Sequence, residues 1–226
     1  MMGAERRSRR GLSVNSGRPT DESDHDMRAS EAQRPPAWIV RSPVLARAYR
    51  LAASAHASQH RATDGAPFLD HVVEVATLLE EAGFDQESIT AGLLHDSVER
   101  GTLTAERLRR EMGDGVSSLV LALTEDGSID SFAERKAALR EQVRVSGPEA
   151  VTIFAADKLS DINGLRRGID RFGAEIEQRM GTTVGGMASH YRASVEMIEA
   201  SLPRSVFIPA LHARLEELDR YAAARR

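Results

Sequence analysis

The sequence predicts an all-α fold, a helical bundle that follows a disordered N-terminal tail. Aromatic residues make up only 4% of the chain, whereas alanine, leucine, glutamate and arginine are plentiful. These residues favour helices that pack through aliphatic side chains. Several segments also place apolar residues at the spacing of one helix face. With 226 residues and 41% hydrophobic content, the chain can bury the core of one such domain.

Charge and cysteine content exclude several classes of function. The net charge of -4 and the pI near 6.0 give no general footprint for nucleic acid or for an anionic membrane. The sequence has no cysteine, which excludes disulfide scaffolds, thiolate nucleophiles and cysteine-based metal sites. It also has no apolar run long enough to cross a membrane and no secretion signal. We expect a cytoplasmic protein without nucleic-acid or membrane partners, whose metal would be held by histidine and carboxylate.

The N-terminal segment, residues 1–37, differs in composition from the rest of the chain. It is rich in arginine, serine, aspartate and glutamate, has few large apolar residues, and carries Pro35 and Pro36 near its end. Such a segment cannot offset its ordering entropy by burial. We therefore predict a disordered tail over residues 1–37 and one domain over residues 38–226.

Three helices are expected in the first part of this domain. They span Pro43–Gln59, Phe68–Ala82 and Gln86–Arg100. A loop over residues 60–67 separates the first two, so His71 lies in the first turn of the second helix. Asp85 is a suitable N-cap for the third helix and Gly101 a suitable stop.

Further helices are expected along the rest of the chain, interrupted at glycines. Thr104 caps a short helix that Gly113 ends, and another apolar turn follows over residues 116–123. Residues 168–186 are expected to be irregular, with a break at Gly185–Gly186. The remaining expected helices are a charged, largely solvated Phe132–Val145, then Pro148–Arg167, Met187–Ser201 and Pro209–Ala224.

An adjacent His95–Asp96 pair ends the apolar run of the third helix. On a helix, Glu99 lies four residues after His95 and three after Asp96, so the three side chains share one face. Imidazole and carboxylate side by side suit a divalent metal. A lone His-Asp pair also occurs by chance, so this interpretation depends on further ligands elsewhere.

Two carboxylates on the Pro148–Arg167 helix, Asp157 and Asp161, offer such ligands. Ion pairing with the neighbouring lysine and arginines is one explanation for acids beside an apolar stripe. The other is that Asp157 completes a metal site with two imidazoles and two carboxylates, from His71, His95, Asp96 and Asp157. Such a set, with open positions, suits Mn²⁺, Fe²⁺ or Mg²⁺ better than structural zinc. A metal held in this way can activate water against a phosphate.

Several stretches around these residues occur in a characteristic order. They are Ala55–Gln59, Arg61, Gly65–His71, Ala91–Glu99 and Ala156–Leu159. This series resembles the Rel/SpoT-type alarmone hydrolase domain, part of the HD superfamily of metal-dependent phosphohydrolases. The resemblance runs from about residue 45 to about residue 200 and includes no synthetase or regulatory domain. It is greatest to the stand-alone small alarmone hydrolases, which include the metazoan SpoT homologue.

The resemblance implies a role for each matching residue. The metal, Mn²⁺ in that family, would be held by His71, His95, Asp96 and Asp157, with Fe²⁺ or Mg²⁺ as alternatives. Water would attack the 3′-diphosphate of guanosine tetra- or pentaphosphate and release pyrophosphate. Catalytic roles would fall to Glu99 and Arg100, and substrate binding to Arg61, Lys158, Asp161 and Tyr191. His56 matches a family position but is expected to be a hydrogen-bonded core histidine.

Three departures from the family pattern keep other functions open. Arg100 replaces an acid that helps to handle water, Ala62 replaces a lysine, and Asp161 replaces an asparagine. Arginine cannot act as a base at neutral pH, although it can grip a phosphate. The hypotheses are an alarmone hydrolase, a related hydrolase of another phosphorylated nucleotide, and a protein that binds metal and nucleotide without hydrolysis.

Overall fold

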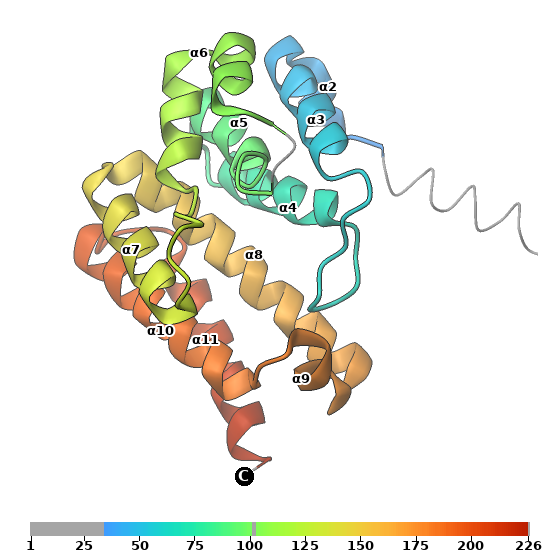
Figure 1. The fold of residues 1–226 in the computed structure, drawn as a ribbon, viewed down its shortest axis with the longest axis vertical. Helices are drawn as coiled ribbons and strands as arrows, with labels where there is room; N and C mark the ends of the chain where they lie inside the picture. Colours follow the sequence, from blue (N-terminus) through green and yellow to red (C-terminus); the bar gives the residue numbers. More distant parts are fainter. Residues whose placement is uncertain (1–33, 101–102, 226) are drawn as a thin grey trace, which may run out of the picture. The chain divides into compact units, whose positions relative to one another are not determined.

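A computed structural model describes residues 34–100 and 103–225 and confirms the all-α prediction (Figure 1). One compact unit spans Ala37–Arg226. The predicted tail stays a prediction, since residues 1–33 lie outside the described part of the chain. Within the described part, the only β pairing is an isolated bridge between His60 and Pro67. The described helices are α2 (Ala37–Arg41), α3 (Pro43–Ala55), α4 (Phe68–Glu81), α5 (Gln86–Leu94), α6 (Ala105–Ala122), α7 (Phe132–Val145), α8 (Pro148–Phe172), α9 (Glu175–Met180), α10 (Val184–Ser201) and α11 (Ile208–Ala223).

Short polar side chains begin five of these helices. Each accepts a hydrogen bond from the backbone N–H three residues later, which satisfies a donor that the first turn leaves free. These N-caps are Ser42, Asp85, Thr104, Ser131 and Thr183. Capping explains why the predicted starts at Pro43, Gln86 and Phe132 are confirmed.

Helix α8 is the central element of the unit (Figure 1). It packs against α4 and α5 on one side and against α7, α10 and α11 on others. Most of its side chains are buried, including Phe154, Ile162 and Leu165. A polar residue of α8 that faces α4 and α5 is therefore held in a rigid environment.

The predicted helix Gln86–Arg100 is too long, because α5 ends at Leu94. The ring of His95 donates a hydrogen bond from Nδ1 to the carbonyl of Gly92 at 2.8 Å. The N–H of Ser97 then bonds to the carbonyl of Leu94, three residues back instead of four. Residues 95–100 consequently form a series of turns, and the predicted stop at Gly101 lies outside the described residues.

The predicted irregular stretch over residues 168–186 is largely helical. Helix α8 continues to Phe172, α9 follows, and Thr183 caps α10, so Gly185 and Gly186 lie in its first turn. Gly168 is a close-packing position, since a Cβ there would lie 2.2 Å from the carbonyl oxygen of Thr63. This glycine allows the loop before α4 to pack against α8.

The remaining boundaries follow the sequence closely. The predicted break at Gly113 is confirmed, because this residue has a φ of 85° and interrupts α6. Helix α3 ends at Ala55, four residues early, since His56 and Gln59 form a turn. Helix α7 has the predicted bounds but is less solvated than expected, with Leu139 and Val143 buried. None of the helices within residues 34–100 and 103–225 combines the length and the hydropathy that a membrane span requires.

Candidate metal centre

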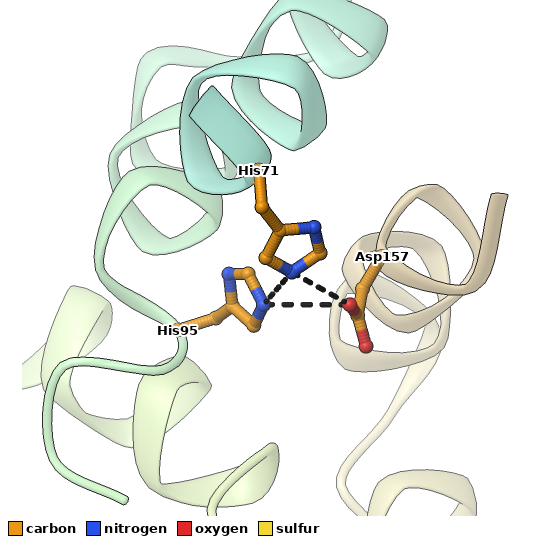
Figure 2. A group of neighbouring side chains, drawn as sticks. All are labelled: His71, His95 and Asp157. Atoms are coloured by element: carbon orange, nitrogen blue, oxygen red, sulfur yellow. Dashed lines mark hydrogen bonds and ion pairs between the residues drawn. The ribbon is translucent and has the colours of Figure 1, made fainter. Parts of the chain in front are cut away.

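Three buried side chains from three elements meet at one point (Figure 2). His71 comes from the first turn of α4, His95 directly follows α5, and Asp157 lies in the middle of α8. The two Nε2 atoms are 3.3 Å apart, and Asp157 Oδ1 is 3.3 Å from His71 and 3.4 Å from His95. These atoms are close enough for all three to bind one ion.

The hydrogen bonds of the two rings prepare them for a cation. His95 Nδ1 donates to the carbonyl of Gly92, so its Nε2 carries a lone pair when the ring is neutral. His71 Nδ1 lies 2.9 Å from the hydroxyl of Ser160. A second hydrogen bond that orients the ring is typical of metal-binding histidines. The donor set therefore fits a divalent metal ion.

The charges around this cluster also favour a cation. Burial lowers the pKa of His95, but Asp96 and Asp157 outweigh burial and raise this pKa to about 9. Burial alone would raise the pKa of Asp157, yet Lys158 and the two histidines hold it well below its usual range. The carboxylate is thus ionised, and the negative charge of the two aspartates attracts positive charge to the imidazole nitrogens.

Asp96, the fourth predicted ligand, lies beside the other three. Its Oδ2 is 3.6 Å from His95 Nε2 and 3.8 Å from His71 Nε2. The same oxygen lies 3.6 Å from Arg100 Nε. Arg100 and a bound metal ion would therefore both interact with the Asp96 carboxylate.

A small polar cavity opens from the metal centre. Of the residues predicted for the site, the cavity is lined by His95, Asp96, Glu99, Arg100, Asp157, Lys158 and Asp161. Glu99 accepts a hydrogen bond from the backbone N–H of Glu125 at 3.3 Å. Partial burial, Asp96 and Glu125 together raise the pKa of Glu99 above its usual value. A carboxylate of this kind is a suitable proton acceptor near neutral pH.

Arg100 is turned toward the cavity and is 44% exposed. Its guanidinium carbon lies 4.0 Å from the centroid of the Phe68 ring, in a cation–π arrangement. The ring and Asp96 therefore hold the guanidinium at the wall of the cavity. From this place it can donate hydrogen bonds to an anion in the cavity.

Lys158 and Asp161 lie together on α8. The ammonium of Lys158 is 2.9 Å from Asp157 Oδ2 and 2.8 Å from Asp161 Oδ2. Lys158 is buried, and its ion pair with Asp157 holds the carboxylate of that residue in one orientation. By pairing with Oδ2, it leaves Oδ1 directed at the two imidazoles.

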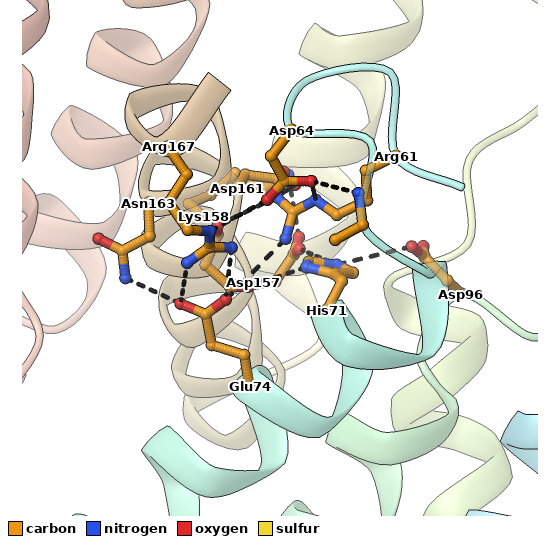
Figure 3. A network of polar contacts seen from close by, with 12 residues as sticks. Arg61, Asp64, His71, Glu74, Asp96, Asp157, Lys158, Asp161, Asn163 and Arg167 are labelled. Atoms are coloured by element: carbon orange, nitrogen blue, oxygen red, sulfur yellow. Dashed lines mark hydrogen bonds and ion pairs between the residues drawn. The ribbon is translucent and has the colours of Figure 1, made fainter. Parts of the chain in front are cut away.

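Arg61 lies outside this cavity, in a buried network between the loop before α4 and α8 (Figure 3). Its Nη2 donates to the carbonyl of Ser160 at 3.1 Å and lies 3.8 Å from Asp161 Oδ1. The loop is further anchored by Arg167, whose Nε is 3.0 Å from Asp64 Oδ2 and whose Nη2 is 3.0 Å from Glu74 Oε2. Arg61 thus contacts the candidate site through Asp161, which lines the cavity, and through the backbone of Ser160.

Tyr191 and His56 are both buried. Tyr191 projects from α10, and burial followed by Asp161 raises its pKa far above the usual value. His56 Nδ1 lies 2.9 Å from Gln59 Oε1, which confirms the prediction of a hydrogen-bonded core histidine.

Three residues near the site were missed from the sequence. Ser160 orients His71, and Glu125 and Lys136 line the cavity as an ion pair. Glu125 lies between two of the expected helical segments, and Lys136 is on a helix that was expected to be solvated. The hydrophobic residues Leu139 and Val143 on α7 were the available signal that this helix packs against the site.

The chain is similar to a known protein family and to several known proteins. A family model described as the HD domain matches residues 48–171. The guanosine-3′,5′-bis(diphosphate) 3′-pyrophosphohydrolase of Aquifex aeolicus is 32% identical over 123 residues, which are 54% of this chain and 18% of that protein. The enzyme of the same name from Danio rerio, MESH1, is 35% identical over 127 residues, which are 55% of this chain and 70% of that protein. The match therefore covers most of the Danio protein but less than a fifth of the Aquifex protein.

Two solved structures resemble the fold. One is described as a metazoan ortholog of SpoT that hydrolyzes ppGpp and plays a role in starvation responses; it has a TM-score of 0.62 and 27% identity, and the alignment covers 79% of this chain and 95% of that chain. The other comes from Listeria monocytogenes EGD-e, with a TM-score of 0.59 and 27% identity over 66% of this chain and 97% of that chain.

Proposed function

The chain belongs to the HD domain family, and from this premise we propose that it is a cytoplasmic metal-dependent phosphohydrolase. Its proposed substrates are guanosine tetra- and pentaphosphate, from which it removes the 3′-diphosphate as pyrophosphate. The observation that carries this proposal is the His71–His95–Asp157 cluster at the end of a polar cavity. The names of the Aquifex and Danio relatives and of the SpoT ortholog support the choice of substrate.

Mn²⁺ is the proposed metal, with His71, His95, Asp96 and Asp157 as ligands. Two imidazoles and two carboxylates suit Mn²⁺ or Fe²⁺, and water can fill the remaining positions. When bound, such an ion would polarise a phosphoryl oxygen and make water a stronger nucleophile. Lys158 would keep Asp157 in its ligating orientation, since it pairs with the oxygen that faces away from the imidazoles.

The acids and cations of the cavity would handle the proton and the phosphate charge. Water attacks the phosphorus next to the ribose 3′ oxygen, and the bond between these two atoms breaks. Glu99 would accept the proton of the attacking water, for which its raised pKa is suitable. Arg100 and Lys136 would bind the oxygens of the departing diphosphate, and a proton from solvent completes the 3′ hydroxyl.

Arg61, Lys158, Asp161 and Tyr191 remain the proposed substrate-binding residues. Asp161 reaches the cavity directly, while Arg61 lies 3.8 Å behind it. Tyr191 and Asp161 are close enough to influence each other's charge, since Asp161 raises the pKa of Tyr191. These residues would shape the side of the site that holds the nucleoside.

Another phosphorylated nucleotide is the second candidate substrate class. The observation in its favour is that Arg100 and Asp161 both line the cavity, so two residues that depart from the family pattern would touch the substrate. A panel of guanine and adenine nucleotides with 2′- or 3′-phosphates separates the candidates. Turnover of guanosine alarmones alone supports the first, and faster turnover of another member supports the second.

Pyrophosphate release from guanosine tetraphosphate tests the main proposal. Purified protein loaded with Mn²⁺ should release pyrophosphate from this substrate. The Asp157→Asn variant should lose at least about 99% of the activity, because it loses a metal ligand. Asp170→Asn is the matched control, since Asp170 is an exposed carboxylate on the same helix. No turnover by wild-type protein with bound Mn²⁺ would contradict the proposal.

A further inference from the structure

A second, larger cavity of about 620 Å³ lies between the loop before α4, the start of α7, and the segment from α9 to α10. Its walls include Ala62, Thr63, Phe132, Met180, Thr182 and Met187. None of the described side chains that line it carries a charge, in contrast to the metal cavity. Phe132 is 49% exposed, and its ring contributes apolar surface to the cavity.

Three elements connect this uncharged cavity to the metal centre. On α7, Phe132 lines the uncharged cavity and Lys136, one turn later, lines the metal cavity. The Lys136 ammonium lies 5.5 Å from the centroid of the Phe132 ring. In the loop before α4, Ala62 directly follows Arg61, which lies beside Asp161. The two cavities are therefore neighbours along the same helix and the same loop.

Helix α10 makes the third connection, through the rings of His190 and Tyr191. The ring of His190 lies 5.7 Å from that of Phe132, edge to face, and 5.4 Å from that of Tyr191. Met187, one turn before Tyr191, lines the uncharged cavity. Thus each of the three elements contributes a residue to the uncharged cavity and carries another that lines the metal cavity, as Lys136 does, or that interacts with Asp161 on its wall, as Arg61 and Tyr191 do.

We propose that the uncharged cavity binds the nucleobase of the nucleotide whose phosphate lies at the metal centre. This inference rests on the proposed function and assigns the base to a site lined by Phe132, Met180 and Met187. An aromatic ring and thioether side chains provide a surface on which a flat base can stack. The described side chains that line this cavity include no cation, and Ala62 provides none, so the cavity is less suited to a phosphate group than to a base.

Thr63 provides a hydrogen-bonding group for the edge of the base. Its hydroxyl oxygen is buried and has no hydrogen-bond partner among the described residues. Because buried polar groups are normally paired, an unpaired hydroxyl at a cavity wall is suited to a ligand. Thr182, on another wall, offers a second hydroxyl.

The test combines kinetics with direct binding in the full-length protein. Phe132→Ala removes the stacking ring, and Met187→Arg places a charge in the cavity. Val145→Ala is the matched control, because Val145 is a 65% exposed apolar residue at the other end of α7. With guanosine tetraphosphate, the first two variants should raise KM about tenfold with little change in kcat, as expected for a lost base-stacking contact. The control should behave as wild type, and thermal melting of each variant checks that it folds.

Binding of guanosine, which has no phosphate, tests the cavity independently of hydrolysis. Saturation-transfer NMR should show contact between the base protons and the wild-type protein, and this contact should persist in Asp157→Asn but weaken in Phe132→Ala and Met187→Arg. If wild-type protein hydrolyses the alarmone while both cavity variants keep its KM, the inference is wrong and the proposed function stands. If wild-type protein shows no hydrolysis, guanosine binding decides alone. Absent binding, or binding that neither variant weakens, overturns the inference.

Discussion

Arg100 lines the cavity beside Asp96, one of the candidate metal ligands. Its guanidinium rests on the Phe68 ring and lies 3.6 Å from Asp96, so it faces the cavity with its charge only partly compensated. An arginine here cannot accept a proton from water. Its hydrogen-bond donors can instead bind a phosphate in two-point fashion. We therefore assign phosphate binding to Arg100 and proton transfer to Glu99.

Substitution of Arg100 by aspartate tests this assignment. Arg100→Asp should lower kcat/KM for guanosine tetraphosphate by about 10- to 100-fold, the value of one charge-assisted hydrogen bond. Arg110→Asp, at an exposed position of α6, should have little effect. A rise of more than about tenfold in Arg100→Asp would show that the native arginine hinders catalysis.

The lowered pKa of His190 makes the folding stability depend on pH. Burial, followed by Lys158, Lys136 and Arg140, lowers its pKa to about 3. In the unfolded chain this pKa is about 6.5. Below pH 6.5 the unfolded state therefore binds a proton that the folded state does not, and folding stability falls as the pH decreases.

Replacement of His190 by glutamine should make the protein less sensitive to acid. The loss of unfolding free energy between pH 7 and pH 5 should be smaller in His190→Gln than in wild type, by at most about 2 kcal/mol. Urea denaturation at the two pH values measures this difference. Between pH 7 and pH 8 the two proteins should change in parallel, and an equal loss on acidification would contradict the low pKa.

At the residue scale, the ligand types could be predicted, as could ion pairing of Asp157 and Asp161 with the neighbouring lysine, whereas the partner of His71, Ser160, could not. His71, His95 and Asp157 were identified from residue type and order along the chain, and they meet in the structure. Lys158 was expected either to pair with these aspartates or to bind substrate; the structure shows both ion pairs, and their burial depends on how α8 is turned. A helical period predicts a face, whereas the rotation of that face toward a particular neighbour is decided by packing.

At the scale of elements, α8 has a glycine that sequence patterns misinterpret. Gly168 was expected to begin an irregular stretch, since glycine is unfavourable inside helices. It lies within α8, where glycine is needed because the carbonyl of Thr63 occupies the space that a Cβ would fill. A contact with a residue so distant in sequence leaves no local signal. Capping residues do leave one: Asp85 and Thr104 were predicted as N-caps, and they begin α5 and α6.

Two glycine substitutions separate helix propensity from close packing. Gly168→Ala should destabilise the protein by about 1–3 kcal/mol, because its Cβ would overlap backbone. Gly185→Ala should change stability by less than about 1 kcal/mol, because the nearest atom to its Cβ would be that of Ala222 at 4.0 Å. Chemical denaturation of both variants measures the contrast. Equal effects would contradict the close approach at Gly168.

At the scale of the whole molecule, the metal centre joins elements that are distant in sequence. Its candidate ligands come from α4, the segment after α5, and α8. An ion bound to all of them would stabilise the folded state, because the unfolded chain cannot hold these groups together.

Thermal unfolding with and without Mn²⁺ tests this linkage. At a metal concentration about 100 times Kd, the folded state should gain about 2.7 kcal/mol. For a chain of this size, that gain corresponds to a rise in Tm of roughly 5–10 °C. Asp157→Asn should lose most of the rise, and a chelator should reverse it in wild type. A rise of equal size in the variant would place the metal elsewhere.

Product analysis in water labelled with heavy oxygen shows which bond the protein hydrolyses and where water attacks. Mn²⁺-loaded protein is incubated with guanosine tetraphosphate, and the products are identified by mass spectrometry. The proposed mechanism should give unlabelled guanosine diphosphate and pyrophosphate that carries one labelled oxygen, because water attacks phosphorus at the 3′ position. No products despite bound metal, release of orthophosphate, or label in the nucleotide would contradict it.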